Sequence, residues 1–206
     1  MCKEAIMSRI RPHTPSRPHA VASHERRRFL AAAAGILAAG SGIAARPAFA
    51  RTRASGAERA LSVHNLHTGE TLRTVYWAQG MYLPESLAEV NHLLRDFRNN
   101  ETKAIAPSLL DLLHAITERL GATQPIQLVS GYRSPSTNAM LHARSAGVAK
   151  HSLHMDGMAA DIRVPGHDLT QLHRVALSLQ AGGVGLYPRS DFVHVDIGRV
   201  RRWQGV

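Results

Sequence analysis

The sequence after residue 60 predicts an α+β fold, with a small, mainly antiparallel sheet and helices packed on one side. The first observation is a pair of short segments that alternate between apolar and polar residues around a turn. The second is two successive amphipathic helices, and the third is a series of short apolar segments interrupted by one further helix. This order of elements along the chain favours antiparallel pairing of the strands.

The first elements are a hairpin followed by two helices. Residues 61–66 and 71–77 alternate roughly with period two, and residues 67–70 between them supply a turn. A helix is expected over residues 84–99, because proline opens it and apolar side chains recur on one face. A second helix is expected over residues 107–120, since a glycine follows its last apolar position.

The second half of the chain consists mostly of expected strands. A buried strand is expected over residues 125–131, and a short helix or loop over residues 137–146. The remaining elements are a strand at 158–164, a helix at 168–181, and strands at 182–187 and 192–197, the last being the final strand. We therefore expect one domain over residues 61–206, preceded by a flexible lead-in at 51–60.

Residues 1–50 have the three-part pattern of a secretory signal. A basic segment ends in Arg26-Arg27-Arg28, an Ala-rich apolar stretch covers roughly 29–45, and a small-x-small sequence ends at Ala50. The arginine pair predicts export by the twin-arginine translocase, cleavage after Ala50 and a periplasmic protein. The apolar stretch is too short and too rich in alanine for a membrane anchor. A basic tail followed by an Ala-rich helix is the alternative.

Charge and cysteine content restrict the class of partner. Residues 1–50 hold 8 of the 25 Lys and Arg and 2 of the 15 Asp and Glu, so they carry +6 of the net +10. The remaining +4 is no evidence for nucleic-acid binding, although it is compatible with an anionic polymer. Cys2 is the only cysteine, so residues 51–206 contain neither a disulfide nor a thiolate metal site.

Three side chains form the most informative pattern. His154 and Asp161 are seven residues apart with Gly157 between them, and His194 follows 33 residues later. Two neutral imidazoles and one carboxylate are a common set of ligands for catalytic zinc, and they leave the fourth position to water. Zinc lowers the pKa of that water from about 15.7 to near 7. If the three residues converge, the sequence predicts a zinc hydrolase.

A zinc hydrolase also needs a general base and a positive group for the developing oxyanion. Arg133 ends the buried strand, where its guanidinium can hold a carboxylate or carbonyl oxygen. Asp191 lies three residues before His194 at the turn into the last strand. Asp196 shares a strand face with His194, so it is expected either to orient a ligand or to be buried beneath the site. His151 is a further possible hydrogen-bond partner of the ligands.

Several ordered motifs carry a resemblance to a known family. They are Ser130-Gly131-Tyr132-Arg133-Ser134, Ser152-x-His154-x-x-Gly157-x-Ala159-x-Asp161, Gly185-x-Tyr187 and Phe192-Val193-His194-Val195-Asp196-x-Gly198. Together they resemble the zinc D-alanyl-D-alanine peptidase superfamily and, more closely, the YcbK-like murein endopeptidases. The resemblance covers about residues 61–203.

The resemblance implies a small α+β fold shared with the amidase domain of hedgehog signalling proteins. It implies that His154, Asp161 and His194 are the zinc ligands and that Arg133 binds substrate or the transition state. The implied substrate is the peptidoglycan stem peptide, including cross-links that join two diaminopimelate residues. Many superfamily members carry Glu where this chain has Asp191. The base is therefore Asp191, Asp196 or a water network that involves both, and its position in the sequence favours Asp191.

Three functions remain open at this point. The first is a zinc endopeptidase that cuts cross-linked peptidoglycan. The second is a zinc carboxypeptidase or dipeptidase that trims terminal D-amino acids, because the bond is similar and only the shape of the cleft differs. The third is a zinc-stabilised wall-binding module without catalysis, because a fold and a metal site do not guarantee turnover. The complete ligand set together with Arg133 favours an enzyme.

Overall fold

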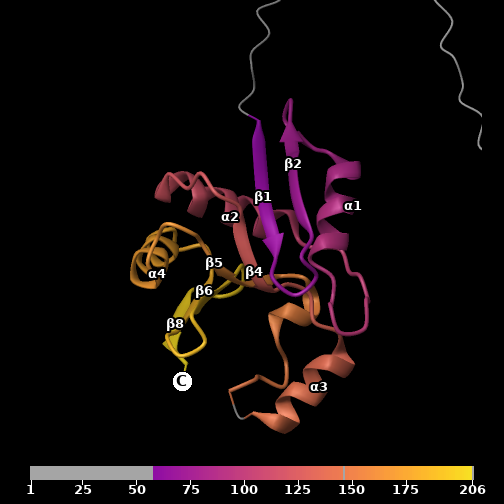
Figure 1. Ribbon diagram of the computed structural model, residues 1–206, viewed down its shortest axis with the longest axis vertical. Coiled ribbons are helices and arrows are strands. Elements are labelled where there is room, and N and C mark those ends of the chain that lie inside the picture. Colours follow the sequence, from indigo (N-terminus) through magenta and orange to yellow (C-terminus); the bar gives the residue numbers. More distant parts are fainter. Residues whose placement is uncertain (1–57, 146, 206) are drawn as a thin grey trace, which may run out of the picture. The chain divides into compact units, whose positions relative to one another are not determined.

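The computed structural model describes residues 58–145 and 147–205, which form an α+β unit (Figure 1). The expected signal over residues 1–50 and most of the lead-in lie outside the described residues. One eight-stranded sheet has the order β3-β2-β1-β4-β5-β7-β6-β8. The strands are β1 (Arg59–Asn65), β2 (Thr71–Ala78), β3 (Met81–Tyr82), β4 (Ile126–Ser130), β5 (Ala159–Arg163), β6 (Gly183–Tyr187), β7 (Phe192–Asp196) and β8 (Arg201–Gln204).

Strand pairing in the sheet is mostly antiparallel, as the sequence predicted. The β1–β4 and β6–β8 pairs are parallel, and the other five are antiparallel. Within the described residues, four α-helices accompany the sheet: α1 (Pro84–Leu93), α2 (Pro107–Leu120), α3 (Pro135–Arg144) and α4 (Leu169–Ser178). None of the described helices is long and apolar enough to cross a membrane.

The two faces of the central strands have different roles. Val193 and Val195 of β7 are fully buried in one hydrophobic cluster, to which α1, α2 and α4 contribute. Side chains alternate along a strand, so His194 and Asp196 point to the opposite face. Helix α3 contributes no residue to this cluster and lies below the sheet in Figure 1. The core therefore supports β5 and β7 from one side and leaves the other side for the polar site.

The first helix is shorter than the sequence predicted, and the expectation of a helix to residue 99 is wrong. Helix α1 ends at Leu93, and its carbonyl oxygen accepts a hydrogen bond from Asn65 Nδ2 at 3.0 Å. The next carbonyl oxygen, of Leu94, accepts from the Tyr132 amide at 2.7 Å instead of continuing the helix. The buried carboxylate of Asp96 accepts from the Ser134 amide at 2.9 Å. These contacts tie the segment after α1 to the backbone on both sides of Arg133.

Two strands of the sheet, β3 and β8, were not predicted from the sequence. Strand β3 has two residues, and β8 has four, of which Arg201, Arg202 and Gln204 are polar. Neither has a hydrophobic alternation that is long enough to indicate a strand. The expectation that residues 192–197 form the last strand is therefore wrong, because β8 follows and pairs parallel with β6. The first strand also begins at Arg59, inside the segment expected to be a flexible lead-in.

Candidate metal centre

His154, Asp161 and His194 converge at one point. His194 Nδ1 lies 2.9 Å from Asp161 Oδ1, His154 Nε2 lies 3.3 Å from the same oxygen, and the two nitrogens are 3.2 Å apart. Donors at about 2.0–2.1 Å from a tetrahedral metal are separated by about 3.3–3.4 Å. Within the described residues, this is the one group of three His, Cys, Asp or Glu whose ligand atoms are close enough to hold a metal ion.

Two strands and one tight turn produce this convergence. Asp161 on β5 is paired directly with His194 on β7, so their side chains emerge side by side. His154 belongs to the 3-10 helix η1 (Leu153–Asp156), which ends at Gly157 with a φ of 68°. A Cβ atom at Gly157 would lie 2.5 Å from the Ala104 carbonyl oxygen. Glycine therefore allows the chain to turn closely from His154 into β5.

Each imidazole is held by a hydrogen bond at its outer nitrogen. His154 Nδ1 lies 2.7 Å from the Gly131 carbonyl oxygen, which is an acceptor and so requires a proton on that nitrogen. His194 Nε2 lies 3.1 Å from Asp196 Oδ2. With a metal ion bound, the outer nitrogens would keep these protons, and the inner nitrogens, which face Asp161, would be unprotonated and able to coordinate it. This is the arrangement that outer carbonyl and carboxylate groups impose on metal-binding histidines.

Electrostatics at the centre favour a bound cation. Burial opposes ionisation of Asp161, but the adjacent His154 and His194 outweigh it and hold the pKa of Asp161 below its usual range. Burial lowers the pKa of His154, which keeps this ring neutral. Burial also acts to lower the pKa of His194, but hydrogen bonds to Asp161 and Asp196 outweigh it and raise the pKa. The ring of His194 thus lies between two carboxylates.

Asp196 lies behind His194, completely shielded from solvent. Burial would raise its pKa, but hydrogen bonds from His194, Arg201 and two backbone amides hold the pKa below its usual range. Asp196 does not line the cavity that contains the three ligands. Its carboxylate therefore reaches the site through the ring of His194 and not directly.

Arg133 lies beside the three ligands. Its side chain is 11% exposed, and its Nη2 lies 3.8 Å from Asp161 Oδ2. Nη1 donates a hydrogen bond to Asn138 Oδ1 at 3.3 Å, whereas the buried Nε has no hydrogen-bond partner within the described part of the chain. Burial lowers the pKa of Arg133, and the charge of Asp161 offsets part of this effect. A guanidinium does not deprotonate in proteins, so Arg133 supplies a fixed positive charge.

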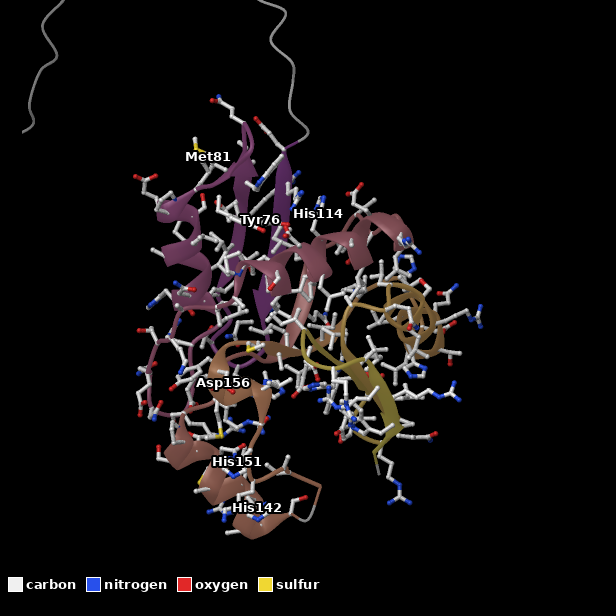
Figure 2. All side chains as sticks on the ribbon, turned by 180° about the vertical axis from the view of Figure 1, so that it is seen from behind. Tyr76, Met81, His114, His142, His151 and Asp156 are labelled. Carbon is white, nitrogen blue, oxygen red and sulfur yellow. The ribbon has the colours of Figure 1, made fainter. Side chains whose placement is uncertain are left out.

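The ligands and Arg133 line a cavity of about 320 Å³. One wall is formed by residues of the segment from Gly147 to Leu153, which includes His151. Figure 2 shows His151 at the end of the molecule opposite to Met81. The opposite wall consists of side chains from β6, β7 and β8, namely Tyr187, Phe192, Arg201 and Trp203. Arg201 and Trp203 were not identified as part of the site from the sequence, because β8 was not recognised.

The aromatic wall is a connected structure. Trp203 Nε1 donates to Tyr187 Oη at 2.9 Å, and the Trp203 ring lies 5.2 Å from the ring of His194. The rings of Tyr187 and Phe192 are stacked with centroids 4.5 Å apart. A Cβ atom at Gly185 would collide with the Trp203 ring, so only glycine lets the ring lie flat on β6. The wall therefore presents a fixed apolar surface beside the metal ligands.

Asp191 lies in the turn before β7, outside the residues that line this cavity. Its φ is 52°, its side chain is 68% exposed, and its Oδ2 lies 3.3 Å from Arg163 Nε. The Arg163 guanidinium also donates to the backbone carbonyls of Asp191 and Ser190. The structure thus brings together Arg133, the three ligands and, one layer deeper, Asp196. Asp191 is not part of this group.

Comparison with known proteins identifies the family to which the chain belongs. Residues 53–203 match the family described as Peptidoglycan L,D-endopeptidase MepK. The protein of that name from Escherichia coli K12 is 47% identical over 177 residues, which cover 86% of this chain and 96% of that protein. A probable member from Haemophilus influenzae is 42% identical over 149 residues, covering 72% of this chain and 80% of that protein. The chain therefore belongs to the MepK family of peptidases.

Proposed function

We propose that this chain is a zinc-dependent peptidoglycan L,D-endopeptidase, which hydrolyses cross-links between stem peptides. The observation that carries the proposal is the convergence of His154 Nε2, Asp161 Oδ1 and His194 Nδ1 beside Arg133 in one cavity. The names of the family and of its relatives supply the substrate class. The set of two imidazoles and one carboxylate supports zinc as the metal. The fold is proposed to be that of hedgehog-type and D-Ala-D-Ala peptidases.

The protein side chains prepare the cavity for hydrolysis. Zinc, when bound, supplies Lewis-acid chemistry and makes water a nucleophile at neutral pH. The buried guanidinium of Arg133 offers donors to a substrate carboxylate or to the oxygen on which negative charge develops. The aromatic wall, which includes Tyr187 and Trp203, excludes water from one side of the cavity and provides apolar contact for a stem peptide.

Asp196 and Asp191 are proposed to differ in role. Asp196 contacts His194 Nε2 and is buried, which supports orientation of the ligand ring over direct proton transfer from water. Asp191 contacts Arg163 outside the cavity, which supports a role in the turn. Both remain candidates for the base, and conservative substitutions separate the roles.

Asp196→Asn is expected to weaken zinc binding by about 10- to 100-fold, because an amide cannot accept all the hydrogen bonds of the carboxylate. Asp191→Asn is expected to keep zinc and to keep turnover within a few-fold. Loss of a general base would instead lower turnover by roughly 100- to 10,000-fold. Zinc affinity by chelator competition and cleavage rate are measured for both variants. A zinc-loaded Asp191→Asn protein with turnover reduced by that factor would identify Asp191 as the base.

Digestion of purified muropeptide dimers tests the proposed activity. An endopeptidase converts L,D-cross-linked dimers to monomers, whereas a carboxypeptidase leaves trimmed dimers. Dimers joined by a D,D-linkage are the matched control substrate and are expected to be cut more slowly. Unchanged dimers in the presence of zinc-loaded protein would reject the proposal and favour a wall-binding module.

Export is proposed to follow the twin-arginine route, with cleavage after Ala50 and a periplasmic location. The support is the sequence of residues 1–50 and the cell-wall substrate of the relatives. Replacing Arg26 and Arg27 with Lys is expected to retain the precursor in the cytoplasm, because the translocase reads the arginine pair. Cell fractionation with detection of the chain measures this. Normal periplasmic accumulation of the double variant would contradict the assigned route.

A further inference from the structure

The carboxylate of Asp196 is bound at both oxygens, but by different groups. Oδ1 accepts hydrogen bonds from the amides of Gly183 and Gly198, each at 2.9 Å, and from Arg201 Nη1 at 3.1 Å. Oδ2 is contacted by His194 Nε2 at 3.1 Å and by Arg201 Nη2 at 2.7 Å. Arg201 is therefore the group that bridges both oxygens. It also touches the one oxygen that contacts the His194 ring.

Arg201 is itself held in place by residues close to it in the chain. Nη1 also donates to the Arg199 carbonyl oxygen at 3.0 Å, and the guanidinium lies 4.9 Å from the centroid of the Trp203 ring. The side chain is 36% exposed at the edge of the catalytic cavity, while the Asp196 side chain has no exposure. A planar guanidinium that forms two parallel bonds fixes the plane of the carboxylate, as a single donor cannot.

We propose that Arg201 is a positioning residue of the metal centre, which sets the orientation of the His194 ring through the carboxylate of Asp196. The proposal rests on the proposed function in that it requires His194 to bind the metal. Arg201 belongs to β8, which contributes none of the three metal ligands. Its proposed effect on the metal therefore acts only through its contacts with Asp196.

The geometry explains why such a group is needed. The ring of His194 can rotate about its side-chain bonds, and its Nδ1 faces Asp161 only while Nε2 is held from behind. The two backbone amides contact only Oδ1, so they leave Oδ2 free to swing about that anchor. Arg201 Nη2 removes this freedom. A looser Oδ2 would lower the fraction of time for which all three ligand atoms converge, and metal affinity would fall accordingly.

A purely structural role gives a different expectation. If Arg201 only compensates the buried charge of Asp196, a lysine supplies the same charge and should preserve metal binding. If Arg201 acts by bridging both oxygens, lysine is a poor replacement because it lacks the planar fork. The matched control is Arg202, which carries the same charge on the same strand, is exposed and points to the opposite face.

The experiment compares Arg201→Lys with Arg202→Lys in the full exported chain. Zinc affinity is measured by competition with a chelator, the melting temperature is measured without metal, and the visible spectrum of the cobalt-substituted protein reports coordination geometry. We expect Arg201→Lys to bind zinc about tenfold more weakly and to show an altered cobalt spectrum. The melting temperature without metal should remain close to that of the wild type. Arg202→Lys should match the wild type in all three measurements.

A double-mutant cycle with Asp196→Asn keeps the proposal testable even where Arg201→Lys loses stability. If Arg201 acts through Asp196, adding Arg201→Lys to Asp196→Asn causes little further loss of zinc affinity. Losses that multiply in the double variant would overturn the proposed connection. Equal zinc affinity in Arg201→Lys and Arg202→Lys would overturn the role of Arg201 alone, whereas a wild-type chain that binds no zinc would overturn the proposed function as well.

Discussion

Replacing His154 with alanine is expected to remove stoichiometric zinc and to lower cross-link cleavage by at least about 1000-fold. The substitution deletes Nε2, one of three ligand atoms that lie 2.9–3.3 Å apart. Two remaining ligands do not form a catalytic zinc site. The metal supplies several kcal/mol of charge stabilisation to the transition state. A loss of about 4 kcal/mol corresponds to a rate about 1000-fold lower. Metal content and the rate of muropeptide cleavage are the measurements.

The matched control for this variant is His92→Ala. His92 is an exposed histidine on α1 that does not line the cavity, so its loss should change neither zinc content nor rate. The melting temperature of both variants shows whether the fold is retained. Full zinc content in a folded His154→Ala protein would refute the assignment of the ligand set.

Arg133→Lys is expected to keep the fold and the zinc but to lose at least about tenfold in cleavage rate, a cost of about 1.4 kcal/mol in the barrier. The guanidinium lies in the cavity beside Asp161, and its buried Nε has no partner within the described residues. A group that binds the developing oxyanion stabilises the transition state more than the ground state, so turnover should fall more than metal content. Lysine cannot reproduce the fork of donors.

Arg163→Lys serves as the control, because Arg163 pairs with Asp191 outside the cavity. Its cleavage rate should equal that of the wild type. Zinc content, melting temperature and rate are compared for the two variants. A zinc-free or unfolded Arg133→Lys protein would make Arg133 a structural residue, and an unchanged rate would remove it from the site.

The predictable parts of the fold were those with strong local signals. Helix α2 has the expected bounds, because proline is its first residue, glycine follows its last residue, and five buried apolar side chains lie between. Helix α1 ended six residues early, because Asn65, Tyr132 and Ser134 bind the backbone and side chains of residues 93–96. These partners are 28 to 38 residues away in the sequence, so no local pattern reports them.

The candidate site also has features that the sequence indicated and features that only the structure shows. The residue types of His154, Asp161 and His194 suggested a zinc ligand set, because two imidazoles and one carboxylate are common ligands of catalytic zinc, and the resemblance to a peptidase family strengthened the prediction. The position of Asp191 relative to His194 suggested a base. A positive φ and the contact with Arg163 instead direct this carboxylate into the turn, away from the cavity.

The sequence by itself indicated the cluster of His154, Asp161 and His194, the arginine beside it and the α+β class, because residue type, turn residues and hydrophobic periodicity are local properties. The tertiary structure alone decided that Asp191 lies outside the cavity and that β8 contributes to its second wall. Arg201 reaches Asp196, and Trp203 reaches the ring of His194, because the short polar strand β8 pairs parallel with β6. Strand preference depends strongly on the neighbouring strands of the sheet. The four residues of β8 are too few to show a hydrophobic alternation, so their sequence alone does not indicate a strand.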